Sequence, residues 1–285
     1  MKAGVHNITM EEYVMDPCPT PSLSSSVAIE LLEKSPAHAR LLHPRMERPP
    51  QNEWSSAANF GSAVHTLVFG GPAIVQVHAN NWQTKIAKEA REQALLSGMI
   101  PLLVDDFDRA TQVAAHADVA LNSLASEWEF EQTFLWQRGP VWLRCRTDAV
   151  TPDLRTIVDL KTTGTNARDA NRQFFAQGYD MQAAFLEAGA DSVDPSSARG
   201  RKIYYLFAET EPPFASSILE VTESVLIIAR KKRIAATNLW RKCLETGVWP
   251  SYPTTPMMAA RPSWSEYAWL MREEMDSTID IEDHP

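Results

Sequence analysis

The chain has 285 residues, of which 44% are hydrophobic and nine are tryptophans, and its formal net charge is −9 at pH 7. This length and composition predict one large domain, or one domain with appendages, that buries a sizeable core. The sequence contains no run of about 18 apolar residues, so no membrane-spanning helix is expected.

Cysteine usage indicates a reducing compartment. Cys18, Cys145 and Cys243 lie far apart and form no CxxC pair, which argues against a zinc or iron–sulfur site built on cysteine alone. The first residues, MKAGVHNITMEEYVMDP, lack the apolar segment of a signal peptide. We therefore expect a cytoplasmic protein.

The acidity is unevenly distributed. From Glu273 to the end there are six acids and no lysine or arginine, which leaves a net charge of −3 on residues 1–272. Residues 251–285 are therefore expected to form an acidic, flexible tail. A net negative charge disfavours phosphate binding, which needs local positive charge. Basic clusters at residues 199–202 and 230–233 supply such charge locally.

The first half of the chain predicts helices. Residues 1–22 contain three closely spaced prolines and are expected to be irregular. A serine-capped helix then begins near Leu23 and is interrupted or ended at Pro36. After a loop over residues 45–54, further helices are predicted over residues 55–69, 82–98 and 105–125.

The pattern changes near Trp128, where polar and apolar residues begin to alternate. EWEFEQTFLWQ and VWLRCRTDAV predict a hairpin, and TIVDLKTT predicts a third strand. A helix over about residues 168–189, two strands and a long helix that begins after Thr222 follow. This order predicts a mixed α/β fold, with a central mixed β-sheet of about five strands flanked by helices.

Two aspartates and a lysine in this region suggest chemistry. Strand alternation points Asp159 and Lys161 to one side and Val158 and Leu160 to the other. A turn at TPDLR brings Asp148 close to Asp159. Because two neighbouring carboxylates repel each other unless a positive charge lies between them, the pattern favours a magnesium or manganese ion, with the Leu160 carbonyl as a further ligand.

Simpler explanations of these residues remain open. Asp159 and Lys161 could form an ordinary salt bridge on a solvent-facing strand. A carboxylate pair also serves hydrolases such as glycosidases, although that scheme needs neither a lysine at D-x-K nor a metal. A third alternative is a catalytically weak DNA-binding or assembly protein that keeps a nuclease fold.

Five motifs in order carry a resemblance to a known family. They are LSSSVAIELLEKSPAH (23–38), FGSAVHTLVF (60–69), CRTDAV (145–150), IVDLKTT (157–163) and GYDMQAAFLEAG (178–189). With Asp148, Asp159 and Lys161 as D-(x)n-(D/E)-x-K, they resemble the nuclease domain of the exonuclease VIII (RecE) family, phage and prophage type, in the PD-(D/E)xK superfamily. The resemblance implies a restriction-endonuclease-like core over residues 23–250 with an N-terminal helical region, and a helical insertion over about residues 72–125.

The resemblance also implies a function and further site residues. It implies a Mg²⁺-dependent exonuclease, with Mn²⁺ as a substitute, that degrades one strand of linear duplex DNA from the 5′ end and leaves 3′ overhangs for recombination. A single-strand annealing protein and a homo-oligomeric ring are implied partners. His65 would lie at the metal, Tyr179 and Gln182 would match the Y-x-x-Q pair, and Lys161 would be the catalytic lysine. The four-cysteine cluster of some relatives is absent, so no iron–sulfur cluster is expected.

Several side chains are candidates for contact with DNA. Arg144, Arg146 and Asp148 alternate along the sequence, so the two guanidinium groups are expected either beside the metal or as counter-charges of the acids. Lys202 and the RKKR cluster (230–233) could contact the phosphate backbone. Trp54 and Trp142 are candidates for stacking on a frayed base.

Overall fold

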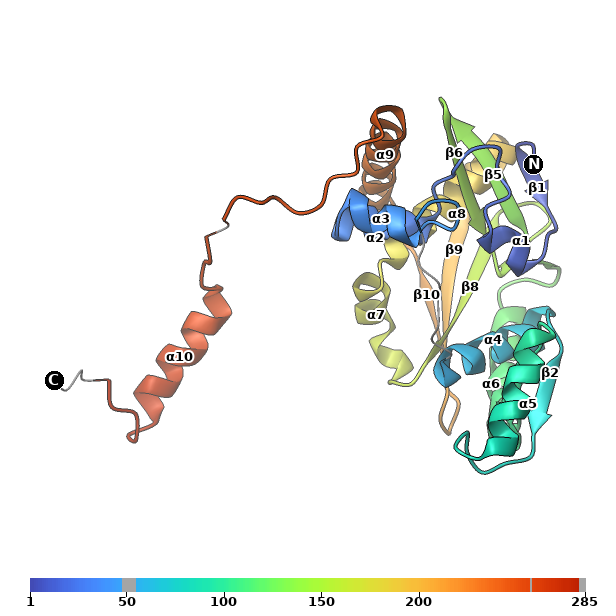
Figure 1. Ribbon diagram of the computed structural model, residues 1–285, viewed down its shortest axis with the longest axis horizontal. Helices are drawn as coiled ribbons and strands as arrows, with labels where there is room; N and C mark the ends of the chain where they lie inside the picture. Colours follow the sequence, from blue (N-terminus) through green and yellow to red (C-terminus); the bar gives the residue numbers. More distant parts are fainter. Residues whose placement is uncertain (48–54, 257, 282–285) are drawn as a thin grey trace. The chain divides into compact units, whose positions relative to one another are not determined.

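A computed structural model describes residues 1–47, 55–256 and 258–281 (Figure 1). The chain divides into two compact units, residues 1–251 and 252–285. Most of the predicted loop over residues 45–54, with Trp54, lies outside the described residues.

A mixed five-stranded sheet forms the centre of the first unit, as the sequence predicts. Its strand order is β10-β9-β8-β7-β4, and β8 and β9 are parallel whereas the other neighbours are antiparallel. The strands are β4 (Glu129–Phe130), β7 (Ala149–Val150), β8 (Thr156–Thr163), β9 (Lys202–Glu209) and β10 (Ser216–Glu220).

A second sheet has the order β1-β5-β6, with β1 (Gly4–His6), β5 (Thr133–Arg138) and β6 (Val141–Arg146). The prediction that residues 1–22 are irregular is therefore wrong. They contribute β1 and a short helix, α1 (Met10–Val14), whose first turn is closed by a capping box between Thr9 and Glu12.

The predicted hairpin is interrupted between these two sheets. Strand β5 pairs with β6, and β4 pairs with β7, so the ladder breaks at Glu131 on one side and at Asp148 on the other. Glu131 has a left-handed backbone with φ of 56°. Such irregularities redirect side chains, and this one lies where the sequence places the first acid of its motif.

Helices cover both faces of the central sheet, which explains why β8 is apolar on both sides. On one face Ile157 packs with Tyr205, Phe185 and Trp240. The same buried cluster includes residues of four helices, α2 (Ser25–Glu33), α3 (Pro36–Leu42), α8 (Tyr179–Val193) and α9 (Glu223–Thr246). On the other face Val158 and Leu160 pack against α4 (Ser56–Phe69) and α6 (Val104–Asn122).

The predicted helix over residues 168–189 is broken in two. A turn of 3₁₀ helix (Ala167–Asp169) leads into α7 (Ala170–Ala176), and α8 begins at Tyr179. Gly178 separates them with a left-handed φ of 69°. A Cβ atom there would lie 3.0 Å from Ile29, so both the turn and the close packing favour glycine.

Residues 72–125 contain more than the two predicted helices. Helix α5 (Lys85–Leu96) and α6 are present, together with a parallel pair of short strands, β2 (Ile74–Val77) and β3 (Ile100–Leu103). A parallel pair needs a crossover, which α5 supplies.

The second unit contains helix α10 (Ser263–Met275), so the segment expected as a flexible tail includes regular structure. Among the described residues, no helix combines the length and apolar character needed to cross a membrane.

Candidate active site

The two aspartates of the motif face each other across β7 and β8. In this register Ala149 pairs with Val158, so Asp148, the residue before Ala149, stands opposite Asp159. Asp148 Oδ2 accepts a hydrogen bond of 2.7 Å from the backbone N–H of Leu160. The turn therefore brings the carboxylates together as the strand pattern predicts.

The second aspartate lies between two side chains that hold it. Lys161 Nζ lies 2.5 Å from Asp159 Oδ1, and Gln182 Nε2 donates a hydrogen bond of 2.5 Å to Asp159 Oδ2. Asp159 is buried, whereas Lys161 keeps 22% of its side chain exposed. Asp159 and Lys161 therefore form the salt bridge that the sequence left open, but on a buried strand and not on a solvent-facing one. The Asp159 carboxylate is buried, and the Lys161 side chain remains partly accessible to solvent.

Tyr179 covers the lysine. The Lys161 ammonium lies 4.7 Å from the centre of the Tyr179 ring, which stacks on Tyr205 at 5.4 Å with an interplanar angle of 17°. The Tyr205 hydroxyl donates to the Tyr179 carbonyl at 3.0 Å. Sequence reasoning did not identify Tyr205, since a tyrosine in an apolar strand reads as an ordinary core residue.

His65 reaches the first aspartate from α4. Its Nε2–H donates to the Leu160 carbonyl at 2.9 Å, and its Nδ1 lies 3.7 Å from Asp148 Oδ2. The Leu160 carbonyl, predicted as a metal ligand, therefore accepts a hydrogen bond from His65, the histidine predicted to lie at the metal.

Glu131 joins this group, and sequence reasoning missed it. One ligand atom each of His65, Glu131 and Asp148 lies within 4.8 Å of the others. Arg146 Nε donates a short hydrogen bond to Glu131, which fixes the carboxylate from behind. In an alternating strand, an acidic residue is expected to face solvent. Glu131 faces the site instead because the hairpin is interrupted at this residue.

The electrostatics of the site favour a cation. Burial, and then the charge of Asp159, raise the pKa of Asp148 from 3.8 to about 7. Burial opposes the charge of Lys161, but Asp159 and Asp148 outweigh it and raise the pKa of Lys161 to about 12. One ammonium group thus leaves negative charge uncompensated. Buried carboxylate oxygens with a nearby imidazole fit a hard divalent cation such as Mg²⁺ or Mn²⁺.

Most of the predicted DNA contacts are engaged elsewhere. Arg144 is buried and contacts Asp16 and Ser22, and Trp142 is buried beside Cys18, so neither lies at the site. Arg146 is the counter-charge of Glu131 and not of either aspartate. Asp148 does not continue the alternation of Arg144 and Arg146, because β6 ends at Arg146.

The basic clusters are largely paired. Lys202 forms an exposed ion pair with Glu220, Arg230 with Glu187 and Glu223, and Lys232 with Asp180. These contacts neutralise much of the positive charge that the sequence suggested for phosphate binding.

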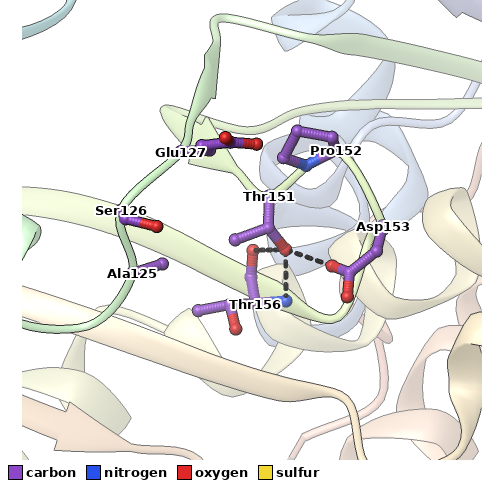
Figure 2. A pocket seen from close by; sticks show the side chains of 7 residues that line it. All are labelled: Ala125, Ser126, Glu127, Thr151, Pro152, Asp153 and Thr156. Atoms are coloured by element: carbon purple, nitrogen blue, oxygen red, sulfur yellow. Dashed lines mark hydrogen bonds between the residues drawn. The ribbon is translucent and has the colours of Figure 1, made fainter.

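An open hollow of about 400 Å³ lies beside the turn that joins β7 and β8 (Figure 2). Thr151 closes this turn with a hydrogen bond of 2.6 Å to Asp153. None of the predicted site residues lines the hollow. Its lining residues are Ala125, Ser126, Glu127, Thr151, Pro152, Asp153 and Thr156.

The fold and the facing acids define a PD-(D/E)xK-type α/β protein. The chain belongs to the family described as a PDDEXK-like domain of unknown function (DUF3799), whose model matches residues 24–255. The expected membership of the PD-(D/E)xK superfamily is thereby confirmed. No curated protein matches the chain.

Two solved structures are similar to this chain. The crystal structure named "Putative exonuclease" from Eubacterium rectale has a TM-score of 0.62 and 13% identity, over 95% of this chain and 99% of that one. A phage related exonuclease from Haemophilus somnus 129PT has a TM-score of 0.31 and 12% identity, over 65% and 95%. The first likeness supports the fold.

Proposed function

We propose that the protein is a metal-dependent exonuclease that hydrolyses phosphodiester bonds of linear double-stranded DNA. The observation that carries the proposal is the pair of facing carboxylates, Asp148 and Asp159, with the Lys161 ammonium beside them. Membership of a PDDEXK-like family supports this assignment. A glycosidase would have no use for the lysine that contacts the second carboxylate.

Four groups would hold the metal: the carboxylates of Asp148 and Asp159, the Leu160 carbonyl and His65. A bound Mg²⁺ or Mn²⁺ would supply Lewis-acid stabilisation of phosphoryl oxygens and acidify a bound water. The hydrogen bond from the His65 Nε2–H holds the Leu160 carbonyl, and Nδ1 of the same ring, which lies toward Asp148, would be the atom that binds the metal. Glu131 would be a further acidic ligand, since one of its oxygens lies within 4.8 Å of ligand atoms of His65 and Asp148.

The remaining side chains orient the reacting groups. Lys161 places a permanent positive charge where negative charge develops on the phosphate, and such preorganised charge stabilises a transition state effectively. Gln182 fixes the rotamer of Asp159 by its hydrogen bond. Tyr179 shields one side of the ammonium, so that Lys161 stays directed at the acids.

Directionality and partners extend the same proposal. The family resemblance supports degradation from the 5′ end, a 3′ overhang for annealing-based recombination, a single-strand annealing protein as partner and a ring of several copies. The complete set of Asp148, Asp159 and Lys161 disfavours a catalytically weak DNA-binding protein.

Linear and circular duplexes of the same sequence provide the test. With Mg²⁺ or Mn²⁺ we expect nucleotides to be released from the linear DNA, no cutting of the covalently closed circle, and no reaction in EDTA. The variant Lys161→Ala should hydrolyse DNA about a hundredfold or more slowly than the parent, with the parental affinity for DNA.

Lys88→Ala, which changes an exposed lysine of α5, is the matched control and should cut like the parent. Cutting of linear DNA in EDTA, or a Lys161→Ala variant as fast as the parent, would contradict the proposal. Cutting of the covalently closed circle would identify the protein as an endonuclease and not an exonuclease.

A further inference from the structure

The exposed face of α7 and of the turn before it carries an unusual set of side chains. The segment buries Ala170 and Phe174, as an amphipathic helix does. On the opposite side it exposes Arg168, Arg172 and Phe175, which follow one another at spacings of four and three residues. Phe175 is 51% exposed, although its neighbour Phe174 is fully packed.

The arginines of this face are free to bind a ligand. In the part of the chain that the structure describes, neither Arg168 nor Arg172 has a side-chain hydrogen bond or ion pair, whereas Arg201 and Arg230 are held by acids. Asp169, between the two arginines, is exposed as well. Among the described residues, Arg168 and Arg172 thus place two guanidinium groups without an acidic partner on one face of a chain whose net charge is −9.

The face is linked to the candidate active site through a chain of ring contacts. The Phe175 ring meets the Phe174 ring at 5.1 Å, and Phe174 in turn packs against Tyr179 and Tyr205. Tyr179 covers Lys161. From the middle of α7, Gln173 donates a hydrogen bond of 2.7 Å to Thr165, which lies four residues beyond Lys161 in the chain.

We propose that Arg168, Arg172 and Phe175, together the α7 face, bind the end of the DNA substrate. The arginines contact consecutive backbone phosphates, and the Phe175 ring stacks on the terminal base. Guanidinium groups bind phosphate oxygens in pairs of hydrogen bonds, and aromatic rings stack on bases of any sequence. The inference rests on the proposed nuclease function and adds to it a surface that receives the DNA end.

Salt-dependent binding separates the two kinds of contact. A fluorescently labelled blunt duplex is titrated with the full chain in EDTA at several salt concentrations, so that nothing is cut. Each phosphate contact contributes about 0.9 to the slope of log K against log salt. The double variant R168A/R172A should therefore weaken binding and lower the slope by about 1.8.

Phe175→Ala should behave differently. Loss of one stacked base weakens binding by about tenfold without a change in the salt slope. It should also lower the preference for a free end over a hairpin-closed end of the same duplex. Arg138→Ala and Leu96→Ala, which change an exposed arginine at the end of β5 and an exposed leucine of α5, are the matched controls and should bind like the parent.

The outcomes distinguish this inference from the proposed function. If the parent binds and cuts linear DNA but the α7 variants bind with the parental affinity and slope, the α7 face is not a DNA site and the nuclease assignment stands. If the parent neither binds nor cuts duplex DNA with Mg²⁺ or Mn²⁺, the proposed function fails and the inference with it. Parental circular dichroism spectra of the variants exclude misfolding as the cause of weaker binding.

Discussion

Asp148→Asn removes one of the two facing charges while keeping the shape of the side chain. The asparagine Oδ1 can still accept the hydrogen bond from the Leu160 N–H. In the parent the pKa of Asp148 rises from 3.8 to about 7 on folding, so the folded state holds this proton more tightly than the unfolded chain does. The parent therefore loses stability as pH rises from about 4 to about 7.

The size of this loss follows from the same shift. A rise in pKa from 3.8 to about 7 corresponds to at most about 4 kcal/mol of unfolding free energy. In EDTA, Asp148→Asn should thus be more stable than the parent by about 2 to 4 kcal/mol at pH 8, and by at most about 1 kcal/mol at pH 4.5. Urea unfolding at both pH values measures the difference.

The matched control is Asp118→Asn, which changes an exposed aspartate of α6 and should shift stability by less than about 0.5 kcal/mol at either pH. Addition of Mn²⁺ should stabilise the parent and not Asp148→Asn, because the variant lacks a charged ligand. An Asp148→Asn variant that is less stable than the parent at pH 8, or whose gain does not change with pH, would refute the reasoning.

Three further substitutions test separate parts of the structure. Gly189→Ala should destabilise the fold by about 2 kcal/mol in urea unfolding, because the new Cβ would lie 2.6 Å from Cys145 Sγ; unchanged stability would contradict the packing. Gln182→Ala should slow DNA hydrolysis about tenfold with unchanged DNA affinity, since it frees the Asp159 rotamer; a change in affinity alone would contradict that role. Glu131→Gln should weaken Mn²⁺ binding in calorimetry about tenfold, and parental affinity would exclude Glu131 as a ligand.

The local pattern of the chain predicted much of the central sheet. Alternation placed Val158 and Leu160 on one side of β8 and Asp159 on the other, and the turn at TPDLR set the register. These features depend on neighbours a few residues away, so sequence alone can specify them. The D-x-K motif and the family resemblance then identified Asp148, Asp159 and Lys161 as candidate site residues.

Features that depend on distant pairings were missed. Strand β1 exists because Gly4–His6 pairs with β5, and Arg144 is drawn inward by Asp16, more than a hundred residues earlier in the chain. Neither partner can be read from the local sequence. Glu131 escaped notice for a related reason, since a break in a two-strand ladder, and not residue type, determines its direction.

Crystals soaked in Mn²⁺ would test the central claim most directly, through the anomalous scattering of the ion. We predict a peak bound by Asp148 and Asp159, with the Leu160 carbonyl and His65 close to it and Lys161 free of the ion. A structure in which those two aspartates bind no common ion, at a Mn²⁺ concentration that supports DNA hydrolysis in solution, would contradict it.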